Sequence, residues 1–392
     1  VNGISSMSTS TTSFEQLDQS YAEGGVEAVL DTLISSLREQ KKFHELFEAL
    51  KMKARNELGL PLLYSDSGDS LDSDTRNKLE DALIAACKEV GLALLDDGKA
   101  GEGWMYMRVV GDRSAAKQIL DSIDVSDENI DEMVDVLLNE GVDVGRGFSI
   151  VLNHYGTCNS ITTYESLMYQ KSREEQQVCA QLLLDHLHND LVATVKADIG
   201  QQSGSEATGD TLEELVNDRD WLFGEHSYHV DTTHLASTVR FSRVLEEEAS
   251  LRKAMDLTFY GRNLNEQFQY AGEEPFADIY VHHALYFQAL LSENLEEAMA
   301  HFEDRARTVV KEQEGTAAVE TYIDLLARLG RTEDAVAATM ELLPPGSHSM
   351  GMAPSLHELC ESSGDFTPIK EVAKTQMDVL GYVSGLLEAR TR

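Results

Sequence analysis

The chain has 392 residues, 42% of them hydrophobic and 26% charged, and its formal net charge is −37 because 69 acidic residues oppose 32 basic ones. A surface this negative repels nucleic-acid phosphates and anionic lipid, so neither nucleic acid nor a membrane is an expected partner. The four cysteines are widely spaced, and the sequence contains no membrane-spanning apolar run and no signal segment. These features predict a cytoplasmic protein with reduced thiols.

Apolar residues recur at helical spacing along most of the sequence, and strand-type alternation is scarce, which predicts an all-α protein. Residues 1–13 are rich in Ser and Thr and are predicted to be disordered. Residues 14–199 then form an N-terminal region of helical hairpins. Its first hairpin is expected within residues 14–59, because Gly59-Leu60-Pro61 stops the second helix.

Further helices follow in both halves of the sequence. The stretch 200–209, rich in Gly, Ser and Gln, is predicted to be a linker or long loop that marks a domain boundary. Residues 210–392 form the C-terminal helical region. The other helices expected before the linker cover residues 76–95, 102–110, 114–123, 127–140, 148–155 and 164–199.

The stretch from Trp221 to Arg243 concentrates groups that bind metals, protons or anions. It contains three histidines and Asp231 at the point where an irregular segment becomes a helix. Asp231 is a favoured N-cap, because its carboxylate accepts hydrogen bonds from the free N–H groups of a first helical turn. This stretch is the predicted functional centre.

Three interpretations of the stretch remain open at this point. In the simplest, Asp231 only caps the helix. In the second, His229, Asp231 and His234 bind zinc or another divalent cation, since imidazole and carboxylate are ligands for such ions. In the third, the helix N-terminus and the histidines bind an anion with help from Arg240 or Arg243.

Polar and aromatic residues continue beyond this stretch in a mixture typical of a ligand pocket. His283 is the exception, because its apolar neighbours predict a histidine packed in the core. The candidate catalytic residues are His154, Tyr260, Arg262 and Asp278, and the candidate ligand-binding residues are His226, Arg240, Tyr270 and His282.

Two helix pairs are predicted near the C-terminus, residues 277–291 with 295–310 and residues 316–329 with 332–343. The two pairs share a similar turn, Asn294-Leu295-Glu296-Glu297-Ala298 in one and Gly330-Arg331-Thr332-Glu333-Asp334-Ala335 in the other. The two alanines are 37 residues apart, and Phe302 follows the first of them in its helix. This pattern resembles tetratricopeptide repeats, whose period is about 34 residues. The resemblance implies stacked antiparallel helical hairpins, an α-solenoid. The sequence departs from the family at the small residue of the first helix, where Tyr286 and Ile323 stand.

Two classes of function fit these features. The first is a helical-repeat binding or scaffold protein with a polar pocket around residues 226–283, which binds a protein segment or a small anionic ligand. The alternative is a metal-dependent enzyme that uses His229, Asp231 and His234 for hydrolysis or proton transfer on an anionic substrate. A divalent metal such as zinc is the cofactor that the alternative requires.

Overall fold

The computed structural model describes residues 14–62, 71–205, 207–224, 228–310, 314–343 and 351–389. Every regular element in these ranges is a helix or helical turn, and the described ranges contain no strand, only an isolated bridge between Ala271 and Asp278. The all-α prediction is therefore confirmed for the described part of the protein. The segment predicted to be disordered, residues 1–13, lies outside it. Internal contacts divide the protein into two compact units, Val1–Val151 and Leu152–Arg392.

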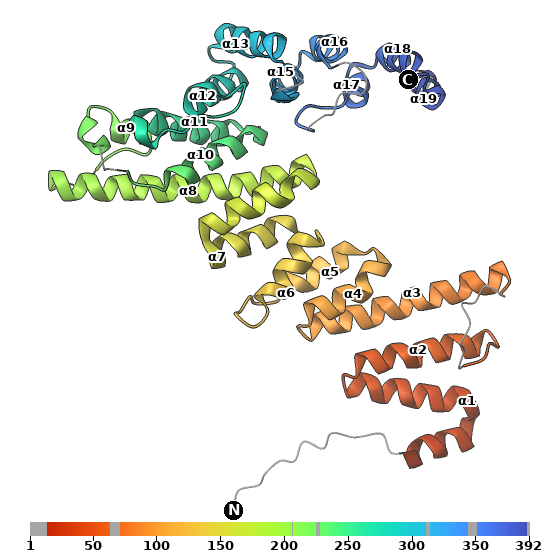
Figure 1. Cartoon of the computed structure of the whole chain (residues 1–392). Helices are drawn as coiled ribbons and strands as arrows, with labels where there is room; N and C mark the ends of the chain where they lie inside the picture. Colours follow the sequence, from red (N-terminus) through yellow and green to blue (C-terminus); the bar gives the residue numbers. More distant parts are fainter. Residues whose placement is uncertain are drawn as a thin grey trace, which may run out of the picture. The chain divides into compact units, whose positions relative to one another are not determined.

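In the first unit the helices from α1 to α5 each pack against the next one in the sequence, and α6 and η1 pack against α4 (Figure 1). The predicted hairpin within residues 14–59 is present as its first two helices. A last helix, α7 (Val144–Leu167), begins in this unit and continues into the second. The other elements are α1 (Phe14–Glu39), α2 (Phe43–Glu57), α3 (Ser73–Asp96), α4 (Ala100–Val110), α5 (Arg113–Leu120), α6 (Ile130–Val134) and the π-helical turn η1 (Asp135–Asn139).

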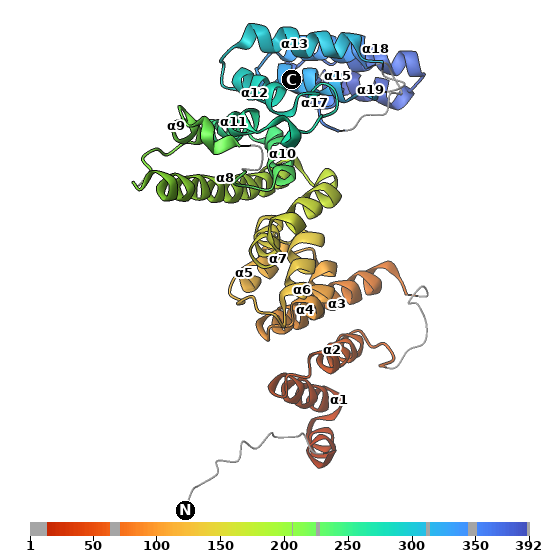
Figure 2. The same ribbon diagram turned by 60° about the vertical axis from the view of Figure 1, so that its left-hand side comes forward.

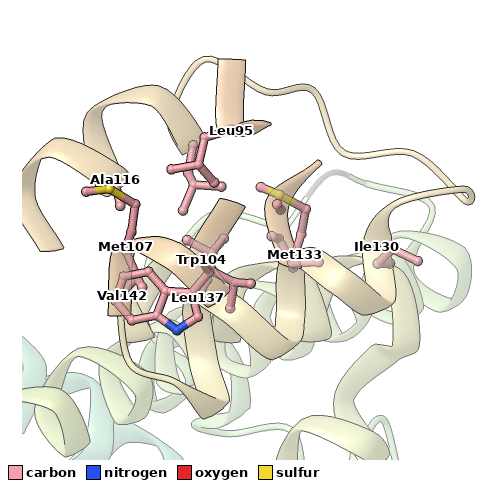
Figure 3. Packing of buried hydrophobic residues seen from close by; sticks show 12 residues of the cluster. Leu95, Trp104, Met107, Ala116, Ile130, Met133, Leu137 and Val142 are labelled. Atoms are coloured by element: carbon pink, nitrogen blue, oxygen red, sulfur yellow. The ribbon is translucent and has the colours of Figure 1, made fainter. Parts of the chain in front are cut away.

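A cluster of buried apolar side chains surrounds Trp104 in the first unit (Figure 3). Trp104 is 5% exposed, and its indole Nε1 donates a hydrogen bond to Glu140 Oε2 at 3.0 Å. Helix α4 approaches α3 closely at Gly103, because a Cβ there would lie 2.9 Å from the Gly91 carbonyl oxygen. The absence of a side chain at Gly103 therefore sets the distance between these two helices.

The second unit is also entirely helical in its described ranges, and in Figures 1 and 2 its long helix α8 runs along α9, α10 and α11. Its α-helices are α8 (Arg173–Ser203), α9 (Leu212–Val216), α10 (Thr232–Phe241), α11 (Glu248–Asn263), α12 (Ile279–Leu290), α13 (Leu295–Thr308), α15 (Ala317–Arg328), α16 (Thr332–Leu342), α17 (Leu356–Ser363), α18 (Thr367–Gln376) and α19 (Val379–Glu388). Short turns η2 (Met168–Gln170), η3 (Asp220–Phe223), η4 (Ser242–Val244) and η5 (Glu266–Phe268) connect them.

Helix α8 begins and ends at strong local signals. Ser172 and Glu175 form a reciprocal capping box at its start, and Gly204 ends it in the left-handed conformation with φ 71°. Between these ends the helix buries part of its apolar face. The buried members of that face are Leu183, Leu187, Leu191 and Val195.

The stretch 200–209, expected to be a linker and boundary, lies within the second unit, and α8 extends through its first residues to Ser203. Ile199 is only 3% exposed, so packing against neighbouring helices holds this end of α8 in place. The division between the units lies at Val151 and Leu152, inside α7. The Gly and Ser residues after Ser203 thus mark the end of a helix.

The two C-terminal hairpins have the helix bounds that the sequence pattern predicts, with α12 paired to α13 and α15 to α16. Ala298 and Ala335, near the start of each second helix, are fully buried, and Phe302 is fully buried as well. A small residue at such a position lets two helices approach closely. Membership of the tetratricopeptide family stays a prediction. In the part of the protein described here, no helix is both long and apolar enough to cross a membrane.

Candidate functional site

Asp231 caps α10, as the simplest of the three interpretations predicts. Its Oδ1 accepts hydrogen bonds from the backbone N–H groups of Thr233 at 2.9 Å and His234 at 3.4 Å, and from the Thr233 hydroxyl at 2.6 Å. The hydrogen bonds from Thr233 are the main cause that lowers the pKa of the Asp231 carboxyl below its ordinary value. One oxygen of the carboxylate, Oδ1, is therefore engaged by its own helix.

His229 is held by two residues from other helices. Its Nε2 lies 3.1 Å from Asp198 Oδ2 on α8, and its Nδ1 lies 2.9 Å from the Tyr260 hydroxyl on α11. The same hydroxyl accepts the His229 backbone N–H at 3.0 Å. Burial raises the pKa of Tyr260 to about 12, so the phenol stays protonated at neutral pH and donates to Nδ1. The imidazole thereby holds the segment before α10 against α8 and α11.

The residues predicted to form a metal site are not brought together. His229 faces Asp198 and Tyr260, Asp231 caps α10, and His234 is a half-buried residue of the first helical turn. His226 lies outside the described residues. Among the described residues, no group of three or more His, Cys, Asp or Glu side chains is arranged to hold a metal ion.

Replacing Asp231 by alanine is expected to lower the free energy of unfolding by about 0.5–2 kcal/mol, whereas asparagine, an equally good cap, is expected to cost much less. Because the folded-state pKa of Asp231 is lowered, its contribution is present at neutral pH and is lost as the pH falls through that lowered value. Urea unfolding of the three proteins at pH 7 and in acid measures both effects. An alanine variant as stable as the parent at pH 7 would contradict the capping role.

The other candidate residues are dispersed in local structural roles. His154 and Arg262 are exposed, and the Tyr270 hydroxyl lies 3.0 Å from Thr232 Oγ1. Asp278 caps α12 and donates its backbone N–H to His282 Nδ1 at 3.2 Å, so these two candidate residues are in contact.

Two histidines of α12 have environments set by packing. Burial, together with His301 whose ring centre lies 4.3 Å away, lowers the pKa of His282. His283 is 1% exposed and stacks on Phe276, which confirms the prediction of a core histidine.

A pocket of about 240 Å³ lies in the second unit, at the C-terminal end of α10 and against α7, α8, α12 and α15. We call it the arginine pocket, because three arginines lie among its aromatic and thioether side chains. Its lining residues are Tyr164, Glu165, Met168, Tyr169, Arg173, Gln176, Arg240, Phe241, Arg243, Val244, Tyr286, Thr321, Asp324, Gly351 and Met352.

Two of the three arginines have carboxylate partners inside the pocket. Arg240 Nη2 lies 2.6 Å from Glu165 Oε1, and Arg173 Nη2 lies 3.2 Å from Asp324 Oδ1. Asp324 is 6% exposed and also accepts a hydrogen bond from the Tyr286 hydroxyl at 2.6 Å. The ion pair and the hydrogen bond offset part of the cost of burying this carboxylate, whose Oδ1 accepts no hydrogen bond from a described residue.

Arg243 is held by contacts other than a salt bridge, and the nearby Asp324 carboxylate only partly favours its charged form. Its Nε donates to the Arg240 carbonyl oxygen at 3.0 Å, and its guanidinium lies 4.8 Å from the centre of the Phe276 ring. Within the described ranges, Arg243 forms no salt bridge with a carboxylate. Burial lowers the pKa of its guanidinium, but an arginine remains charged at neutral pH. Its terminal nitrogens therefore present a positive charge at the pocket wall.

Of the residues predicted to bind a ligand, Arg240 lines this pocket, and so does Arg243, named with it in the anion interpretation. Tyr164, Arg173 and Asp324 were missed, because each stands in an ordinary helical pattern far from Arg243 in the sequence. The sequence did contain one signal for the pocket, the scarcity of basic residues. Arg240 and Arg243 are two of only 32 basic residues in a strongly acidic protein.

The protein matches no protein-family model, and comparison with curated proteins and with solved structures found no match either. The interpretation of the arginine pocket therefore rests on its own geometry and chemistry.

Proposed function

We propose that the protein is a helical binding protein, an α-solenoid of antiparallel hairpins, whose second unit binds an anionic ligand in the arginine pocket. The hairpins α12–α13 and α15–α16, with their buried alanines at the turns, support the solenoid. In this proposal the helices serve as a rigid frame that places pocket side chains from distant parts of the sequence around one ligand.

The observation that carries the proposal is the guanidinium of Arg243, which has no salt-bridge partner among the described residues. A partly buried positive charge without a counter-ion is unfavourable, and an anion bound at its terminal nitrogens would remove that cost. Arginine also presents two parallel N–H groups, which match the two oxygens of a carboxylate or phosphate. Because the net charge of the protein is −37, most of its surface repels anions, and a positive pocket is a distinct place for one to bind.

A metal-dependent enzyme has less support from the described residues than an anion-binding protein. Its ligand set would need the Asp231 carboxylate, which three hydrogen bonds engage at the start of α10, and the His229 imidazole, which Asp198 and Tyr260 hold. No described third ligand stands beside either of them.

Replacing Arg243 by methionine is expected to weaken the binding of small anions by about tenfold or more, because a hydrogen bond to a charged group contributes about 1.5–3 kcal/mol. Isothermal titration with acetate, benzoate and inorganic phosphate, at about 0.15 M salt to screen distant charges, measures the effect. Arg252→Met is the matched control, since Arg252 is exposed and pairs with Glu248 and Glu293 outside the pocket. If none of the anions binds the parent in a manner that depends on Arg243, the proposed function is overturned.

A further inference from the structure

We infer that the ligand of the arginine pocket is a monocarboxylate attached to an apolar body about the size of one aromatic ring. This inference rests on the proposed function and names the chemical class of its ligand. It follows from three properties of the pocket: its charge, its volume and the nature of its walls.

The charge of the pocket fits one negative charge on the ligand. Its lining contains three arginines and two carboxylates, and the carboxylates of Glu165 and Asp324 are already paired with Arg240 and Arg173. Two further partners, Arg328 of Asp324 and Glu246 of Arg173, carry opposite charges that offset each other. One positive charge, that of Arg243, is left for the ligand. A carboxylate neutralises it, and its two oxygens match the planar fork of the guanidinium. A phosphate monoester at neutral pH carries close to two charges and would leave an excess negative charge beside Glu165 and Asp324.

The volume of the pocket sets the size of the ligand. At about 240 Å³ it exceeds the roughly 150 Å³ cavity that accepts benzene, and it is smaller than the roughly 300–1,000 Å³ pockets of drug-sized ligands. A simple inorganic anion would leave most of this space to water. A single ring with a short acidic arm fills it.

The walls of the pocket are suited to an apolar body. Tyr164 and Phe241 stack with their ring centres 4.2 Å apart, and both line the pocket with the fully buried Tyr286. Met168 and Met352 add flexible thioether side chains that adapt to the shape of a ring. The apolar contacts would hold the body while Arg243 binds the carboxylate.

The test is titration calorimetry of the full-length protein at pH 8 with four probes. We expect 3-phenylpropanoate to bind at least about tenfold more tightly than 3-phenylpropanamide. The amide lacks the negative charge, so it cannot form the charged hydrogen bond to Arg243. Acetate, which lacks the ring, is expected to be weaker by about tenfold or more. Phenyl phosphate, almost fully dianionic at this pH, is expected to bind more weakly than the carboxylate.

Two variants and one control keep the test independent of folding. Arg243→Met should remove the preference for the carboxylate over the amide, and Arg243→Lys, which keeps the charge but not the fork, should restore part of it. Arg252→Met should bind as the parent does, and thermal unfolding by circular dichroism checks that each variant is folded. A tripeptide that ends in phenylalanine is a further probe. Comparing its affinity with that of 3-phenylpropanoate distinguishes the C-terminal carboxylate of a peptide from a free acid as the ligand.

The possible failures are distinguishable. If phenyl phosphate binds more tightly than 3-phenylpropanoate through Arg243, the ligand class is overturned and the proposed function stands. If acetate binds as well as 3-phenylpropanoate, the apolar body is overturned. If no probe binds through Arg243, both the inference and the proposed function are overturned.

Discussion

Replacing Asp256 by alanine is expected to lower the free energy of unfolding by about 3–5 kcal/mol, because it breaks a buried hydrogen-bonded pair and leaves its partners unsatisfied. Asp256 on α11 lies 2.8 Å from His188 Nε2 on α8, and both side chains are less than a tenth exposed. The carboxylate also accepts the backbone N–H groups of Leu212 at 2.7 Å and Glu213 at 2.9 Å. One aspartate thus connects α8, α11 and the first turn of α9.

Urea unfolding followed by circular dichroism measures this loss, and the protein offers a matched control. Asp190 pairs with His186 on the same helix α8, but Asp190 is 71% exposed and the two groups are 3.4 Å apart. Its replacement by alanine is expected to change stability by no more than about 0.5 kcal/mol, as for an exposed pair. Equal losses in the two variants would contradict the role assigned to Asp256.

Replacing Trp104 by alanine is expected to lower the free energy of unfolding by about 3–5 kcal/mol, the usual cost of removing a large aromatic side chain from a core. Trp104 contributes both the largest side chain of its cluster and a hydrogen bond to Glu140 (Figure 3). Alanine would leave a cavity among Met107, Leu137 and Val142, and would leave Glu140 without this donor.

Met105 provides the control for this experiment, since it is the next residue of α4 and is 51% exposed. Met105→Ala is expected to change the free energy of unfolding by less than about 0.5 kcal/mol, as exposed substitutions usually do. Both variants are measured by urea unfolding with circular dichroism as the signal. A Trp104→Ala protein whose unfolding midpoint equals that of Met105→Ala would show that the cluster does not stabilise the first unit.

Local patterns in the sequence were reliable predictors of helices. The periodic recurrence of apolar residues, with Gly330 at one turn and Asn294 at another, predicted the four helices from α12 to α16 with bounds close to those observed. Asp231 was predicted as a helix cap and is one. Such features depend on residues three or four positions apart, and their energetics are largely the same in a peptide and in a protein.

Predictions that required distant residues to meet were less successful. The histidines near Asp231 suggested a metal site, but His229 instead contacts Asp198 and Tyr260, each 31 residues away in the sequence. The glycine-rich stretch after Ser203 suggested a boundary, whereas the division between the units lies inside α7, where no change in composition marks it. Composition reports the local tendency of the backbone and contains no information on which surfaces pack together.

The sequence by itself determined that the described part of the protein is helical, where the helices of the C-terminal hairpins lie, and that Asp231 caps a helix, because capping and periodicity act within a single turn or two. Only the tertiary structure decided where an anion could bind. The Arg240–Glu165 pair joins residues 75 apart, and Arg173 reaches the Met352 carbonyl oxygen across 179 residues. Arg243 has no salt-bridge partner in the described ranges because the packed helices bring the nearby carboxylates to other arginines. Pairing of this kind is a property of the folded protein.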